Sequence, residues 1–127
     1  MATLTTTDGI QITFVAKAVS ALTDHDASTG EAVTCVYGII ENVLRIRESV
    51  ETLMTRLRIT DNFAKLTRPN GSSVWINGAA VSSIRAPLPN EFVAGVNTVV
   101  FVAGLTQGVA EPPEDVTTSI NDRGGGL

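Results

Sequence analysis

The residues that could do chemistry are few and scattered. His25 is the only histidine and stands in the segment TDHDASTGE with Asp24, Asp26 and Glu31. Oxygen-rich segments can hold calcium, but the EF-hand spacing, with its central glycine and terminal bidentate glutamate, is absent. A solvated hairpin loop is the simpler interpretation of the acidic segment 24–31, and whether it binds a metal stays open at this point. No serine stands in a context that marks it as a nucleophile.

The remaining candidates for chemistry also have structural explanations. Cys35 is the only cysteine and lies in the apolar run TCVYG, so we expect a small buried core residue rather than a reactive thiol. The glycines match neither the P-loop nor the strand–GxGxxG–helix pattern that cradles phosphates. We therefore predict no catalytic residue, no cofactor and no metal site, and a protein that is not an enzyme.

Composition narrows the class further. The chain has 127 residues, 43% of them hydrophobic, and a net charge of −4. This balance makes nucleic acid an unlikely main partner, because phosphate binding needs a basic face. The longest apolar run, VVFVAGL, is too short to span a bilayer, and the first residues, MATLTTTDGI, show no signal-peptide pattern. The sequence thus predicts a soluble protein that is made in a cytoplasm.

The chain resembles itself. Residues 64–84, AKLTRPNGSSVWINGAAVSSI, correspond to residues 2–22, ATLTTTDGIQITFVAKAVSAL. In this correspondence Asp8-Gly9 matches Asn70-Gly71, and both dipeptides favour the primed turns that close tight β-hairpins. Alternating apolar residues after each turn, such as Ile10, Ile12 and Phe14, predict a half-buried strand.

The correspondence continues to a helix in each copy. TCVYG (34–38) matches TVVFV (98–102), and IRESVETLMTRL (46–57) matches VAEPPEDVTTSI (109–120). Ser49 can cap the first helix, and four apolar residues follow at helical spacing (Val50, Leu53, Met54 and Leu57). Pro112 and Pro113 open the second helix, which its threonines predict to be poor and short.

These patterns predict an α+β protein that is mainly β. We expect two tandem β-rich units, each a small barrel or a curved antiparallel sheet that ends in a short helix, packed pseudo-symmetrically. The expected boundaries are 1–62 for the first unit, 63–121 for the second, and 122–127 for a glycine-rich tail of a composition typical of disorder.

Each unit resembles the small FlbD-type motility proteins. The second copy carries Leu66-Thr67, Asn70-Gly71, Ile76-Asn77 and Val109-x-Glu111, and the first carries Leu4-Thr5, Asp8-Gly9 and Ile46-x-Glu48-Ser49-x-Glu51. The resemblance covers nearly the whole chain, but its motifs are turn and cap signals. It implies a bacterial accessory or regulatory protein that binds another protein.

Some residues stand out as candidates for an interface. Trp75 matches Thr13 on the polar face of its strand, so it would be partly exposed in an isolated unit. We expect it to pack either against the other repeat or against a partner. Val99 and Phe101 belong to NTVVFVAGL, a flat, uncharged strand that must be central or paired with another chain. Arg45 and Arg47 complete the candidates.

The sequence therefore predicts a non-enzymatic structural protein of a large assembly. A bacteriophage virion component, such as a head decoration (cement) protein or a tail or neck protein, is the main hypothesis, with the virion as its location. Its partners would be other protein subunits, as a homo-oligomer or with capsid or tail proteins, and no membrane. The alternative is a cytoplasmic FlbD-like motility-associated protein that binds a protein partner.

Overall fold

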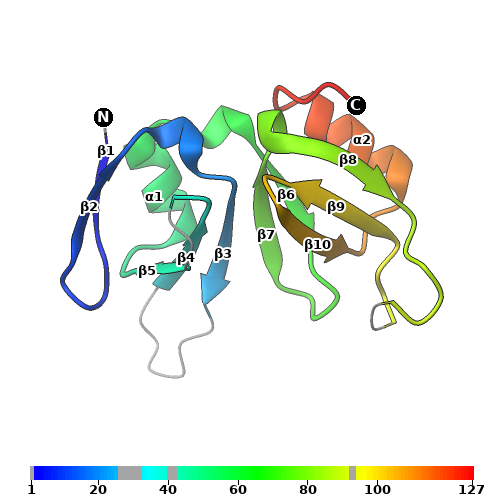
Figure 1. Cartoon of the computed structure of the whole chain (residues 1–127), viewed down its shortest axis with the longest axis horizontal. Helices are drawn as coiled ribbons and strands as arrows, with labels where there is room; N and C mark the ends of the chain where they lie inside the picture. Colours follow the sequence, from blue (N-terminus) through cyan, green and yellow to red (C-terminus); the bar gives the residue numbers. More distant parts are fainter. Residues whose placement is uncertain (1, 26–32, 40–42, 92–93) are drawn as a thin grey trace. The chain divides into compact units, whose positions relative to one another are not determined.

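The computed structural model describes residues 2–25, 33–39, 43–91 and 94–127 (Figure 1). The chain divides into two compact units, unit 1 (Met1–Asp61) and unit 2 (Asn62–Leu127). The sequence placed this boundary one residue later and set residues 122–127 apart, whereas here they belong to unit 2. No helix among the described residues is long and apolar enough to cross a membrane.

Unit 1 is built from strands followed by one α-helix. In order these are β1 (Ala2–Thr5), β2 (Gln11–Phe14), a 3-10 turn (Ala16–Ala18), β3 (Ala21–His25), β4 (Val33–Tyr37), β5 (Leu44–Ile46) and α1 (Val50–Leu57). A short 3-10 turn, Thr60–Asn62, follows.

Unit 2 has the same order of elements. They are β6 (Phe63–Thr67), β7 (Ser73–Asn77), a 3-10 turn (Gly78–Ala80), β8 (Val81–Arg85), β9 (Thr98–Val102), β10 (Leu105–Val109) and α2 (Pro113–Asn121). The described chain is thus mainly β with a C-terminal helix, as the sequence predicted.

Strand pairing within each unit is antiparallel. In unit 1, β1 pairs with β2, and β4 lies between β3 and β5. In unit 2, β6 pairs with β7, and β9 lies between β8 and β10. The described strands of neither unit close into a small barrel, so of the two forms predicted for a unit the open sheet is the one found. The central place of β9 confirms the expectation for the flat segment NTVVFVAGL.

Both hairpin turns differ from the primed turns that Asp8-Gly9 and Asn70-Gly71 predicted. In the first, Gly9 N donates to the Thr6 carbonyl and Thr6 N to the Ile10 carbonyl, each at 2.9 Å. Gly9 and Gly71 have positive φ, +85° and +87°, but Asp8 and Asn70 do not. A type I′ turn needs positive φ at both central residues. Each connection is therefore a three-residue loop with a glycine bulge instead.

Helix α1 forms as the sequence predicted. Ser49 caps it by accepting a hydrogen bond from Thr52 N at 3.2 Å. The four apolar residues at helical spacing are all buried: Val50, Leu53, Met54 and Leu57. The face of the helix that they form is therefore directed into the core of unit 1, as the spacing required.

Helix α2 is short, as predicted, whereas the tail differs from the prediction. The helix has nine residues and α1 has eight, and its first-turn residues Pro113, Glu114 and Asp115 suit a helix start. The tail is ordered against it: Leu127 N donates to Asn121 Oδ1 at 2.8 Å, and Gly125 N to the Ile120 carbonyl at 2.9 Å. Gly125 permits this close approach, because a Cβ there would lie 2.8 Å from the Ile120 carbonyl oxygen.

The core of unit 2 lies between its strands and α2. Its buried residues come from β6, β7, β9, β10 and α2: Ala64, Leu66, Val74, Ile76, Val100, Val102, Val109, Val116 and Ile120. The residues that correspond to several of them in unit 1 are buried too, namely Leu4, Val36, Ile46, Leu53 and Leu57. Each unit thus packs one helix face on β-strands at matching sequence positions.

Candidate functional site

Unit 1 contains a groove between its first hairpin and α1. Its volume is about 590 Å³. Residues of the β1–β2 hairpin, of the end of β5 and the segment after it, and of α1 line it: Thr3, Thr5, Thr6, Thr7, Gly9, Gln11, Ile46, Arg47, Glu48 and Arg56. Its walls therefore carry hydroxyl, amide, guanidinium and carboxylate groups together with one aliphatic side chain.

The hairpin has one polar and one apolar face. Thr3 pairs with Thr13 and Thr5 with Gln11, and all four are exposed. The alternate positions are apolar, because side chains in a strand point to opposite faces in turn. The run TLTTT thus supplies threonine, a good strand former, to the groove while Leu4 is buried.

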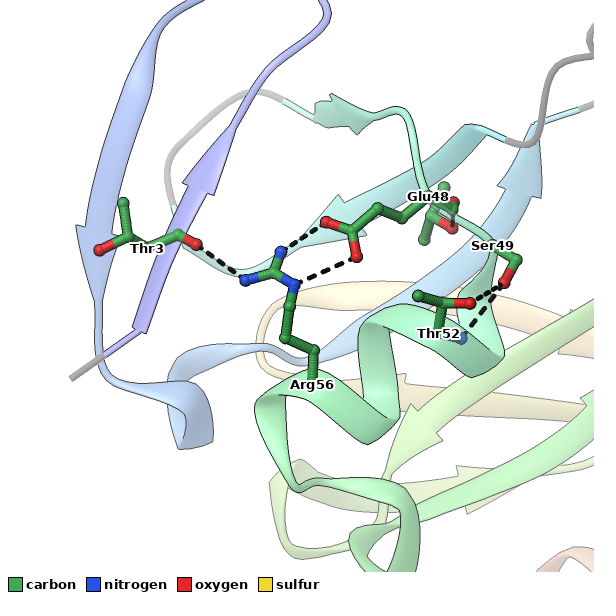
Figure 2. A network of polar contacts seen from close by, with 6 residues as sticks. Thr3, Glu48, Ser49, Thr52 and Arg56 are labelled. Carbon is green, nitrogen blue, oxygen red and sulfur yellow. Dashed lines mark hydrogen bonds and ion pairs between the residues drawn. The ribbon is translucent and has the colours of Figure 1, made fainter.

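An arginine fixes the segment after β5 to the hairpin (Figure 2). Arg56 of α1 donates to both carboxylate oxygens of Glu48, from Nε at 3.1 Å and from the terminal amino group at 2.5 Å. Its other terminal amino group donates to the Thr3 carbonyl at 3.2 Å. The hydrogen bond to Glu48 raises the pKa of Arg56, which therefore stays charged.

This ion pair positions groups rather than stabilising the fold strongly. The Arg56 side chain is 44% exposed, and solvent-exposed pairs contribute only about 0–1 kcal/mol. The bidentate geometry holds the guanidinium plane in one orientation at the rim of the groove. A backbone hydrogen bond from Thr7 N to the Arg45 carbonyl, at 2.9 Å, brings the end of β5 beside the hairpin as well.

The corresponding glutamate of unit 2 makes a different contact. Thr34 Oγ1 donates to the Glu48 carbonyl at 2.6 Å, and Thr98 Oγ1 donates to the Glu111 carbonyl at 2.7 Å. The two backbones are thus held alike. The Glu111 side chain, however, accepts a hydrogen bond from Thr67 N, which lies 3.0 Å from each of its oxygens. It therefore bonds directly to the hairpin strand β6.

A second polar cluster lies in unit 2. Arg85 donates to both carboxylate oxygens of Glu91, and Leu88 N donates to Glu91 Oε1 at 2.9 Å. These bonds, the one from Arg85 first, lower the pKa of Glu91 to about 2. The Arg85 guanidinium also lies 5.4 Å from the ring centroid of Phe101. The cluster fixes the start of the β8–β9 connection.

The predicted interface residues lie in different surroundings. In the whole chain Val99 is fully buried and Trp75 is 6% exposed. Lys65, its cross-strand partner, has Nζ 5.5 Å from the indole centroid. Phe101 is half-buried, while Arg45 and Arg47 are exposed. Side chains as covered as Val99 and Trp75 have little surface to offer a partner.

Among the sequence candidates, only Arg47 and Gly9 lie in the groove. Asp8, Asn70 and Gly71 serve the hairpin turns. The sequence patterns predict neither Arg56 nor the groove threonines as site residues. Two features of the sequence could have indicated the groove: the alternation in TLTTT, and Glu48 eight residues before Arg56. A separation of eight residues does not by itself predict a side-chain contact on a helix.

The expectations about metals and thiols have partial outcomes. In the part of the chain that the structure describes, no three histidine, cysteine, aspartate or glutamate residues cluster as metal ligands would. Asp26 and Glu31 lie outside the described residues, so the question of the acidic segment 24–31 is not addressed. Cys35 is buried, as predicted.

Comparison with known proteins gives no relative. The chain matches no protein-family model, no curated protein and no solved structure. The function must therefore be argued from the residues themselves.

Proposed function

We propose that this chain is a structural protein of a larger assembly and not an enzyme. A bacteriophage virion, in which it would act as a head decoration protein or as a tail or neck component, is the assembly that the sequence favours. In this proposal the two units are diverged copies of one duplicated unit, packed pseudo-symmetrically. Their shared order of elements and the matching bonds of Thr34 and Thr98 support the duplication.

The observation that carries the proposal is the apolar face of the β1–β2 hairpin. Along β2, Phe14 is 8% exposed, Ile12 is half-buried and Ile10, at the turn, is 60% exposed. In unit 2 the position of Ile10 holds Ser72, and Val74, at the position of Ile12, is 1% exposed. The apolar face of the hairpin thus continues into solvent at Ile10 in the first unit, whereas in the second unit it stops at Ser72.

Covering this face would stabilise an assembly. Burying an isoleucine or valine side chain contributes about 1.5–3 kcal/mol when it is fully exposed beforehand, so Ile10 alone would contribute less than that. Val15 and Val43 of the same unit are also exposed, 54% and 43%. Contacts of this size are weak singly, but many of them act together in a lattice.

Light scattering over a concentration series tests the proposal. We expect the average mass of the wild-type protein to rise with concentration, and the Ile10→Ser variant to remain closer to the monomer mass. Leu88→Ser is the matched control, because Leu88 of unit 2 is 59% exposed and its replacement should leave association unchanged. If Leu88→Ser reduces association as much as Ile10→Ser, the hairpin face is not the interface.

A wild-type protein that stays monomeric at every concentration would refute self-assembly. It would favour the alternative, a FlbD-like accessory protein that binds one protein partner. The outer edge of β1 is the feature that suits this alternative, because Thr3 there offers its carbonyl to Arg56 and not to a neighbouring strand.

A further inference from the structure

The two units place a carboxylate differently at one corresponding position. Glu48 lies two residues after β5, and Glu111 lies two residues after β10. The Glu48 carbonyl accepts a hydrogen bond from Thr34 of β4, and the Glu111 carbonyl accepts one from Thr98 of β9. The Glu111 carboxylate binds the amide of Thr67, the last residue of β6. The Glu48 carboxylate binds Arg56 instead.

Thr5 of unit 1 occupies the position that Thr67 occupies in unit 2. Each is the last residue of its strand, and each is paired with the first residue of the next strand, Gln11 or Ser73. Because Thr6 N bonds to the Ile10 carbonyl, the neighbouring pair that contains Thr5 is a non-hydrogen-bonded one. The Thr5 amide therefore points away from β2, toward the outer edge of β1, and Thr5 lines the groove.

We propose that the groove of unit 1 binds a carboxylate from an extended segment of a protein partner. This carboxylate would lie on the Thr5 amide, as the Glu111 carboxylate lies on the Thr67 amide in unit 2. Unit 2 supplies the group from its own chain, whereas unit 1 has turned its glutamate to Arg56 and lines the place with a groove of about 590 Å³.

The charges of the lining agree with this ligand. Arg47 and Arg56 contribute guanidinium groups to the lining, and Glu48 contributes a carboxylate that Arg56 already binds. Guanidinium groups and backbone amides are the donors that bind carboxylates best, and the threonine hydroxyls can donate as well. The inference does not depend on self-assembly, since it concerns the polar face of the hairpin.

Nuclear magnetic resonance of the full chain, labelled with nitrogen-15, tests the site. The probe is the blocked peptide acetyl-Thr-Val-Glu-Val-Thr-amide, and the comparison is the same peptide with glutamine in place of glutamate, at matched ionic strength. We expect the glutamate peptide to shift the amide signal of Thr5 and the Nε signal of Arg56, with about tenfold tighter binding than the glutamine peptide. The Thr67 amide, already bound by Glu111, should not shift.

A third peptide identifies the source of the carboxylate. The glutamine peptide with a free C-terminus carries its carboxylate at the chain end, so binding of this peptide at Thr5 would also support the proposal and assign a C-terminal ligand. Equal binding of the two blocked peptides, shifts confined to other residues, or no shift with any peptide at millimolar concentration would each overturn it.

Two variants separate the groove from general charge attraction. Arg47→Gln should weaken binding of the glutamate peptide by about threefold to tenfold, because it removes a guanidinium group that lines the groove. Arg45→Gln is the matched control: it removes one exposed cation of the same segment that does not line the groove. Equal effects of the two variants would reduce the attraction to net charge and contradict the proposal.

Discussion

Replacing Thr34 by valine tests the hydrogen bond that marks the same place in both units. Thr34 is fully buried, and its Oγ1 donates to the Glu48 carbonyl at 2.6 Å, which fixes the chain just before α1. Valine keeps the branched shape and the strand preference of threonine but removes the donor. The substitution therefore isolates the hydrogen bond as far as one side chain allows.

The expected loss of stability follows from the geometry. A hydrogen bond of this kind contributes about 0.5–1.5 kcal/mol net, and a buried carbonyl left without a donor costs about 1–3 kcal/mol. The contact is only partly buried, so water can reach the Glu48 carbonyl in the variant, and the added methyl group offsets a further part. We expect a net loss of about 1–2 kcal/mol, a sizeable share of the 5–15 kcal/mol typical of a domain.

Urea denaturation followed by far-ultraviolet circular dichroism measures this loss. The midpoint should fall while the slope stays the same, since the surface exposed on unfolding is unchanged. Thr98→Val, which removes the corresponding bond of 2.7 Å in unit 2, should behave alike. Trp75, the only tryptophan, reports the unfolding of unit 2 by its fluorescence.

Thr13→Val provides the control for the same chemical change at an exposed strand position. It should alter the stability by no more than about 0.5 kcal/mol. If Thr34→Val is equally neutral, the bond to Glu48 contributes nothing measurable, and the matching bonds are poor evidence that the two units are built alike.

Two further expectations concern unit 2. Gly78→Ala should cost about 1–3 kcal/mol in urea denaturation, because its Cβ would lie 2.6 Å from the Arg123 carbonyl, whereas Gly126→Ala, with open space around it, should be neutral. The pair formed by Arg85 and Glu91 should contribute stability above the ordinary pKa of 4.5 and lose it as the pH falls toward about 2, since its carboxyl pKa is lowered. Carbon-13 resonances of Glu91 should titrate with a midpoint near 2; an ordinary midpoint would contradict the pairing.

Local patterns of the sequence were enough for the individual elements. Ser49 and the apolar spacing after it determined α1, and alternation with an Asx-Gly dipeptide determined both hairpins. Such features depend on interactions between residues a few positions apart, which any local stretch carries with it. The turn type was missed because the glycine took the bulge position after the turn, a choice that depends on the register of the strands.

The groove depended on contacts that no local pattern contains. Arg56 reaches the Thr3 carbonyl from 53 residues away, and Glu111 reaches the Thr67 amide from 44 residues away. Each contact can form only when the later strands of the unit have brought the chain back to the outer edge of the hairpin. The exposure of Ile10 and the burial of Trp75 were likewise decided by which faces of the hairpins are covered, which alternation alone does not specify.

The sequence by itself thus determined a mainly β chain with two hairpins, two helices and the Ser49 cap of α1, because these follow from backbone preferences and short-range hydrogen bonds. Only the tertiary structure decided where the corresponding glutamates direct their carboxylates, and hence that a polar groove lies in unit 1. The physical reason is that a carboxylate binds whichever donor the folded chain brings within reach: the Arg56 guanidinium in one unit, a strand amide in the other.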